Sequence, residues 1–163
     1  MKRLLLEQAE ANRHINEHWL AVLETLPVEE LERPRGAFFH SIFGTLNHIL
    51  LGDRVWLARI GMEPFKFNTL SDRITESMGE FRPARAHTDD VLIAYVSREH
   101  DFMKDIVYRN SAGSLFRQPL YQVLAHVYAH QHHHRGQISQ MCHEQKIEIP
   151  DGGLIGFYRD LVA

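Results

Sequence analysis

Two histidines interrupt the apolar row that one predicted helix turns toward the protein interior. Over residues 119–146 the residues that share one face at helical spacing are Val123, Val127, His130, His134, Ile138 and Met141. His130 and His134 are four residues apart, so their rings stack on that face. A buried polar ring needs a partner. Two interpretations are open, namely core histidines bonded to the backbone and histidines that bind a metal ion.

Helical periodicity recurs in four segments, and the sequence predicts an all-α protein. The expected helices are residues 4–26, 41–60, 88–108 and 119–146, and the apolar tail 154–162 is expected to form a short C-terminal helix. Ser41 and Thr88 are placed to cap the second and third helices. The longest connection, residues 61–87, is expected to cross over one end of a four-helix bundle.

Composition narrows the class of protein. With 163 residues, of which 44% are apolar, the chain has the size of one domain, residues 1–163. A net charge of -3 without a long basic run argues against nucleic-acid binding. Because no apolar stretch could cross a membrane and charges come early, we expect neither a membrane segment nor a signal peptide, and a cytoplasmic location. The single cysteine, Cys142, is expected to be a packed thiol.

The second predicted helix, residues 41–60, is apolar around most of its circumference. Its main polar residues are Asn47, Arg54 and Arg59. Such a helix has to be covered on more than one side. We therefore expect a homodimer whose interface includes this helix.

A metal site needs at least one further ligand, and His48 is the best candidate. It shares a stripe of the second helix with Thr45, Leu51 and Val55, and the small Gly52 leaves room one turn above it. A core histidine with a backbone partner is the alternative interpretation of His48.

Further polar residues are candidates for supporting roles around such a site. His126, Asn16 and Gln137 could orient ligands, since a metal-binding imidazole usually donates its other nitrogen to a partner. Alternatively, Asn16 and Gln137 bond helix backbones. Glu99 is interpreted either as a base or extra ligand or as a carboxylate that reaches the surface.

Two motifs resemble those of a known family. Residues 41–49, Ser-Ile-Phe-Gly-Thr-Leu-Asn-His-Ile, are followed by Asp53, Trp56 and Arg59. Residues 126–138 read His-Val-Tyr-Ala-His-Gln-His-His-His-Arg-Gly-Gln-Ile. Both are similar to motifs of the DinB/YfiT-like family, to which metal-dependent enzyme activity is ascribed and which is distinct from the DNA polymerase of the same name. The resemblance spans essentially the full chain.

The resemblance implies an up-down-down-up four-helix bundle, usually dimeric, with one divalent metal ion per chain, most often nickel or zinc. The ligands it implies here are His48, His130 and His134. Two departures, His14 in place of a frequent Trp and Ala11 in place of a common aromatic residue, affect the first helix and the mouth of the site.

Some relatives in that family are thiol S-transferases or thiol-dependent isomerases. The expected function is therefore a metal-dependent transferase, which moves a low-molecular-weight thiol to an electrophile, or a hydrolase of a small substrate. No protein nucleophile is assigned. The alternative is a non-catalytic, metal-binding stress-response dimer in which the metal ion holds the helices of the bundle together.

Overall fold

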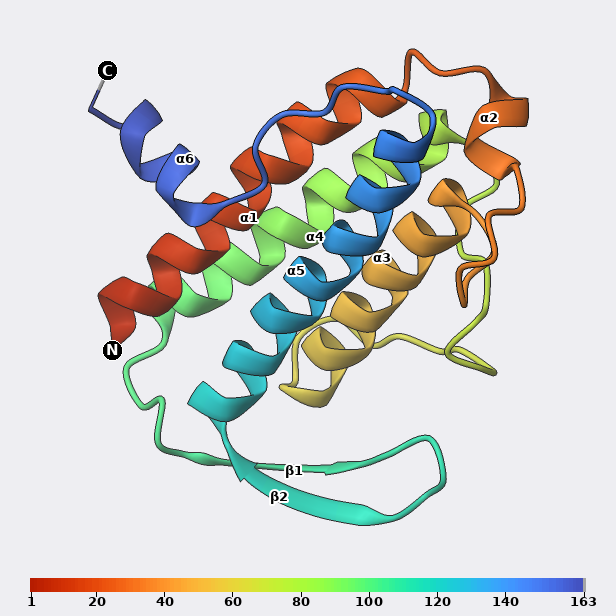
Figure 1. Cartoon of the computed structure of the whole chain (residues 1–163). Coiled ribbons are helices and arrows are strands. Elements are labelled where there is room, and N and C mark those ends of the chain that lie inside the picture. Colours follow the sequence, from red (N-terminus) through yellow and green to blue (C-terminus); the bar gives the residue numbers. More distant parts are fainter. Residues whose placement is uncertain (163) are drawn as a thin grey trace.

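The computed structural model describes residues 1–162, and this part of the chain is mostly helical with one small sheet (Figure 1). The elements are α1 (Lys2–Leu23), α2 (Val28–Glu32), α3 (Ile42–Arg59), α4 (Met78–Arg98), β1 (Asp105–Arg109), β2 (Leu115–Pro119), α5 (Leu120–Glu144) and α6 (Leu154–Asp160). The four long helices lie side by side, and α1 and α3 each pack against both α4 and α5 (Figure 1).

Three of the four long helices form where the periodicity predicts them. The ends of α1, α3 and α5 lie within three residues of the expected positions. The side-chain oxygen of Ser41 accepts a hydrogen bond from the Gly44 amide at 3.0 Å and so caps α3 as predicted. The predicted C-terminal helix is α6, which packs against α1.

The prediction of a third helix over residues 88–108 was wrong at both ends. Ser77, not Thr88, caps this helix, and α4 continues through Pro83, which lies within the predicted connection. The helix ends at Arg98 because Glu99 is extended and its carboxylate accepts hydrogen bonds from the His100 and Asp101 amides. These amides would otherwise need helix carbonyls as partners.

The prediction of a helical fold is confirmed, but it did not include the antiparallel hairpin that β1 and β2 form between α4 and α5. Asp105 pairs with Pro119 and Arg109 with Leu115. The side-chain oxygen of Asn110 accepts from the Ala112 and Ser114 amides, which closes the turn. Pairing between strands ten residues apart outweighed the weak helical pattern of the first strand.

Two apolar clusters fill the interior, and buried polar side chains lie between the helices that build them. One cluster contains Ile15, Trp19, Phe43, Phe81 and Ile138, and the other contains Leu5, Leu57, Leu92, Leu124 and Val127. Burying a side chain of this kind stabilises a fold by about 1.5–3 kcal/mol. The buried Cys142 belongs to the first cluster, in agreement with the expected packed thiol.

The chain itself covers α3, so the apolar surface of this helix does not require a second subunit. Helices α2, α4 and α5 and strand β1 all contact α3. Asn47, expected on its polar side, is 2% exposed beneath the segment that follows the helix, residues 61–77. Oligomeric state therefore stays a prediction. In residues 1–162, none of the helices has the length and apolar character needed to cross a membrane.

Candidate metal centre

Three histidines from two helices meet at one point. His48 lies on α3, and His130 and His134 lie one turn apart on α5. One nitrogen from each ring can be chosen so that all three atoms lie within 4.8 Å of one another. The helices bring these rings together because α3 and α5 pack directly against each other.

Hydrogen bonds at the Nδ1 atoms turn the opposite nitrogens of two of these rings inward. Nδ1 of His48 lies 2.8 Å from the Leu70 carbonyl oxygen, and Nδ1 of His134 lies 2.8 Å from the side-chain oxygen of Gln137. Because these oxygens only accept, each Nδ1 carries the proton. The Nε2 atoms of both neutral rings therefore carry a lone pair and no proton.

The third ring of the group, that of His130, has an unusual environment. Its Nε2 lies 3.0 Å from Nε2 of His48, so the two rings can share only one proton between these atoms. Its Nδ1 is buried and has no hydrogen-bond partner among the described residues. Buried polar atoms of this kind are rare and are typical of strained or ligand-binding groups.

Burial keeps all three rings neutral at physiological pH. Desolvation lowers the pKa of His48 to about 4 and that of His130 to about 3, and it also lowers the pKa of His134. Only the neutral imidazole can bind a metal ion, so none of these rings has to lose a positive charge before binding.

The donor set fits a divalent ion of intermediate softness. Imidazole nitrogens suit zinc and nickel, which they bind at about 2.1 Å, so adjacent ligands on one ion lie about 3 Å apart. The separation between the Nε2 atoms of His48 and His130 is of this size. Three protein ligands also leave coordination positions for other molecules.

Packing around the rings limits their movement. Phe39 stacks on His48 with ring centroids 3.6 Å apart and an angle of 15° between the planes. Gly52 lies against His130, since a Cβ atom at this glycine would be 2.8 Å from the ring carbon Cε1. The expectation that Gly52 makes room near the site agrees with this contact.

The three residues that were expected to support the ligands lie in different surroundings. Gln137 contacts His134 directly through the hydrogen bond described above. His126 is exposed; its ring packs 5.9 Å from that of His130 and 5.1 Å from that of Trp56. Asn16 is buried elsewhere, where its amide donates to Asp89 and Gln131.

Glu99 lies outside the site as well. Its carboxylate accepts from Lys104 and from two backbone amides where α4 ends. These hydrogen bonds, that from Lys104 first, lower its pKa to about 2. Its role is local, and neither a base nor an extra metal ligand is indicated.

A buried network of charged groups was not foreseen from the sequence. Arg85 of α4 donates to Asp53 of α3 at 2.6 Å and to Asp89 at 2.7 Å, and all three side chains are at most 2% exposed. Gln131 of α5 donates to Asp53 at 2.9 Å. This bond ties α3 to α5 next to His130, and desolvation raises the Asp53 pKa to about 6.

Arg135 extends the network to the first helix, where it donates to Asn12 at 2.6 Å. The only signal in the sequence was that Asn12 and Asn16 fall on the inward stripe of α1. Inward-facing asparagines require polar partners, but their spacing does not say which residues supply them.

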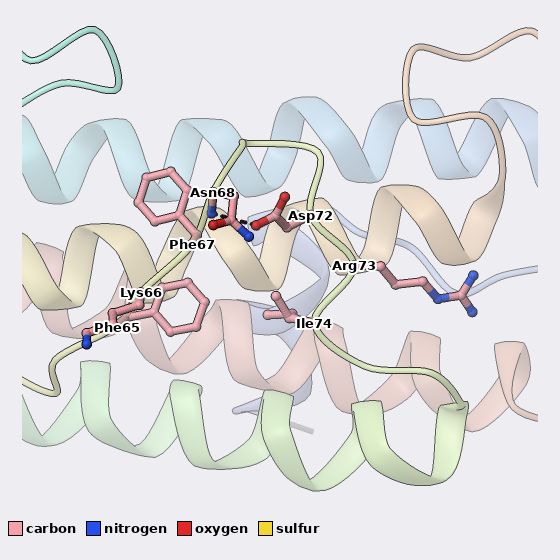
Figure 2. Close-up of a pocket in the computed structure, with 7 residues that line it drawn as sticks. All are labelled: Phe65, Lys66, Phe67, Asn68, Asp72, Arg73 and Ile74. Atoms are coloured by element: carbon pink, nitrogen blue, oxygen red, sulfur yellow. Dashed lines mark hydrogen bonds between the residues drawn. The ribbon is translucent and has the colours of Figure 1, made fainter.

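Two hollows border residues 65–74 of the segment that follows α3. One, of about 280 Å³, is lined by His48 together with Phe38, Phe39, His40 and other residues, so it reaches the histidine group. The other is a wide hollow of about 820 Å³ on the segment itself, lined by Phe65, Lys66, Phe67, Asn68, Asp72, Arg73 and Ile74 (Figure 2). None of the three histidines lines this second hollow.

Comparison with known proteins adds an independent result. The family model described as DinB family matches residues 1–145. The chain is similar to Protein DinB of Bacillus subtilis (strain 168), with 25% identity over 146 residues that cover 83% of this chain and 82% of the relative. Its fold resembles the crystal structure of a DinB-like protein from Bacillus cereus ATCC 10987, with a TM-score of 0.62 and 19% identity over 88% of this chain and 89% of the other.

Proposed function

The chain belongs to the DinB family, and on this premise we propose that it is a divalent-metal-dependent enzyme whose ligands are His48, His130 and His134. The single observation that carries the proposal is the convergence of three neutral imidazoles within 4.8 Å. The proposed ion is zinc or nickel, one per chain. The proposed reaction is transfer of a low-molecular-weight thiol to an electrophile, or hydrolysis of a small substrate.

The chemistry follows from the charge of the donor set. A divalent ion held by three neutral ligands keeps its double charge and lowers the pKa of a thiol or water beside it. The protein supplies the arrangement: Leu70 and Gln137 hold two of the rings by their Nδ1 atoms, and Phe39 closes one side of His48.

The hollow of about 280 Å³ beside His48 supports an open site over a closed structural one. Phe38, which is 77% exposed, and Phe39 give this hollow an aromatic wall. We propose that the electrophile enters here and stacks on this wall. In the transfer reaction the thiol sulfur bonds to the electrophilic carbon, the leaving group departs and the thiol proton is released.

Metal content is the first test. Untagged protein, purified without added metal, is compared by mass spectrometry with the variants His48→Ala and His134→Ala. We expect about one zinc or nickel ion per wild-type chain and loss of this ion in both variants. His143→Ala, an exposed histidine at the end of the same α5, is the matched control and should keep the metal. Equal metal content in all four proteins would contradict the ligand assignment.

Activity separates catalysis from a non-catalytic metal-binding dimer. Metal-loaded protein is incubated with cysteine and a fluorogenic haloalkyl bimane, and thioether formation is followed. Faster formation with wild type than with His134→Ala supports the transferase.

The bundle order up-down-down-up and the homodimer rest on the resemblance to the family. Sedimentation at micromolar concentration tests the dimer, and a monomer would exclude it.

A further inference from the structure

The residue just before the proposed ligand His48 holds the following segment of the chain onto α3. The side-chain oxygen of Asn47 accepts three hydrogen bonds: from the Ile74 amide at 3.0 Å, from the Thr75 amide at 2.9 Å and from the Thr75 hydroxyl at 3.0 Å. Its amide nitrogen donates to the Phe43 carbonyl at 3.2 Å. Asn47 and Thr75 are 2% and 4% exposed, so this contact is shielded from water.

A few residues before this anchor, the same segment also contacts His48. The Leu70 carbonyl accepts from Nδ1 of His48 at 2.8 Å. Asp72 folds this part of the chain, because its carboxylate accepts a hydrogen bond from the Asn68 amide at 2.6 Å (Figure 2). It also accepts one from the Thr69 amide at 3.1 Å. The anchor at residues 74–75 and the carbonyl of residue 70 therefore belong to one short, internally bonded piece of chain.

Neighbouring positions on a helix point about 100° apart, so Asn47 and His48 face different surroundings from one turn of α3. Asn47 holds the segment, and the segment returns a carbonyl to His48. Without the anchor, the Leu70 carbonyl has no other fixed connection to α3 among the hydrogen bonds of residues 68–75.

We propose that Asn47 is a positioning residue for the metal centre: by anchoring residues 70–75 it keeps the Leu70 carbonyl on Nδ1 of His48 and so keeps Nε2 of that ring free for the metal. This inference rests on the proposed function in treating His48 as a ligand. An acceptor on Nδ1 fixes both the tautomer and the orientation of the ring, and loss of such a partner typically weakens metal binding about 10–100-fold.

The first readout needs no metal. In Asn47→Leu, which keeps the size of the side chain but removes the acceptor, nitrogen NMR of the histidine rings in metal-free protein should show His48 leaving the Nδ1-protonated tautomer. The Ile74 and Thr75 amides should exchange faster with solvent. Asn47→Asp retains an acceptor oxygen and should restore the wild-type tautomer.

Zinc affinity is the second readout. Competition titration should show binding about 10–100-fold weaker in Asn47→Leu and recovery in Asn47→Asp. The matched control is Asn110→Leu, because Asn110 also accepts from backbone amides, but in the hairpin turn, which belongs to neither α3 nor α5. If Asn47→Leu does not fold, Thr75→Val removes one of the three hydrogen bonds and should shift tautomer and affinity in the same direction by a smaller factor.

The results separate the two proposals. An unchanged His48 tautomer in Asn47→Leu, with faster exchange at Ile74 and Thr75, would overturn the positioning role whatever the metal affinity. Equal loss of zinc affinity in Asn110→Leu would overturn it as well, since the effect would then be general. Wild-type protein that binds no zinc or nickel would instead contradict the proposed function.

Discussion

Gly52 and His130 touch across the interface between α3 and α5, with no room for a methyl group between them. A Cβ atom at Gly52 would lie 2.8 Å from Cε1 of the His130 ring. His130 is also the ring whose Nδ1 has no hydrogen-bond partner in the described part of the chain. The rings of His48 and His134 are each held by a hydrogen bond at Nδ1. In His130, contact with the α3 backbone takes the place of this hydrogen bond.

Gly52→Ala should displace the His130 ring, because a side-chain end moves more easily than the helix backbone. We expect zinc binding to weaken more than about tenfold, as for loss of a supporting contact. The overpacking cost of about 1–3 kcal/mol is partly offset by the better helix propensity of alanine, about 1 kcal/mol. Zinc titration and urea unfolding measure the two effects.

Gly136→Ala on α5 is the control for this prediction. A Cβ atom at Gly136 meets nothing within 4 Å, so stability should rise by up to about 1 kcal/mol with zinc affinity unchanged. Zinc affinity that stays at the wild-type value in Gly52→Ala would refute the proposed role of the contact.

Gln137→Leu should weaken zinc binding about 10–100-fold, because it removes the acceptor from Nδ1 of His134. The control is Gln140→Leu, one turn farther along α5, where the exposed glutamine donates to Glu144. Similar zinc affinities in the two variants would show that the hydrogen bond to His134 does not support the site.

Arg85→Met should destabilise the fold by about 3–5 kcal/mol, because it leaves the buried carboxylates of Asp53 and Asp89 without their cation. Arg82→Met, one turn earlier on α4, breaks an exposed ion pair with Glu24 and should cost at most about 1 kcal/mol. Urea unfolding of both variants checks the difference. A loss below about 1 kcal/mol in Arg85→Met would mean that the carboxylates are not charged in the folded protein.

Glu99 should contribute to stability in a pH-dependent way. Its pKa is lowered to about 2, so the folded protein binds this proton less readily than the unfolded chain, whose ordinary value is 4.5. The contribution is therefore complete above pH 4.5 and is lost as the pH falls toward 2. Because the carboxylate lies near the surface, we expect about 1 kcal/mol.

The measurement is the difference in unfolding free energy between wild type and Glu99→Gln from pH 7 to the lowest pH at which the protein folds. Taking the difference cancels Asp53, whose raised pKa acts with the opposite sign: its contribution is lost as the pH rises through about 6. A difference that does not shrink with acid would disprove the assignment.

The sequence alone determined three of the four long helices and the side of α5 that turns inward. Periodicity is a local property, so α1, α3 and α5 and the inward direction of His130 and His134 could be predicted from spacing. The Ser41 cap could be predicted for the same reason, since its partner is three residues away.

Only the tertiary structure decided which residues meet from different elements. The hairpin depends on pairing between β1 and β2, and the network around Arg85 joins α3 and α4 to α5. The Leu70 carbonyl reaches His48 from 22 residues away. Spacing along one helix shows that a polar side chain is buried and needs a partner, but the path of the remaining chain selects that partner. For His48, His130 and His134, these tertiary contacts favour a candidate metal centre over a group of core histidines.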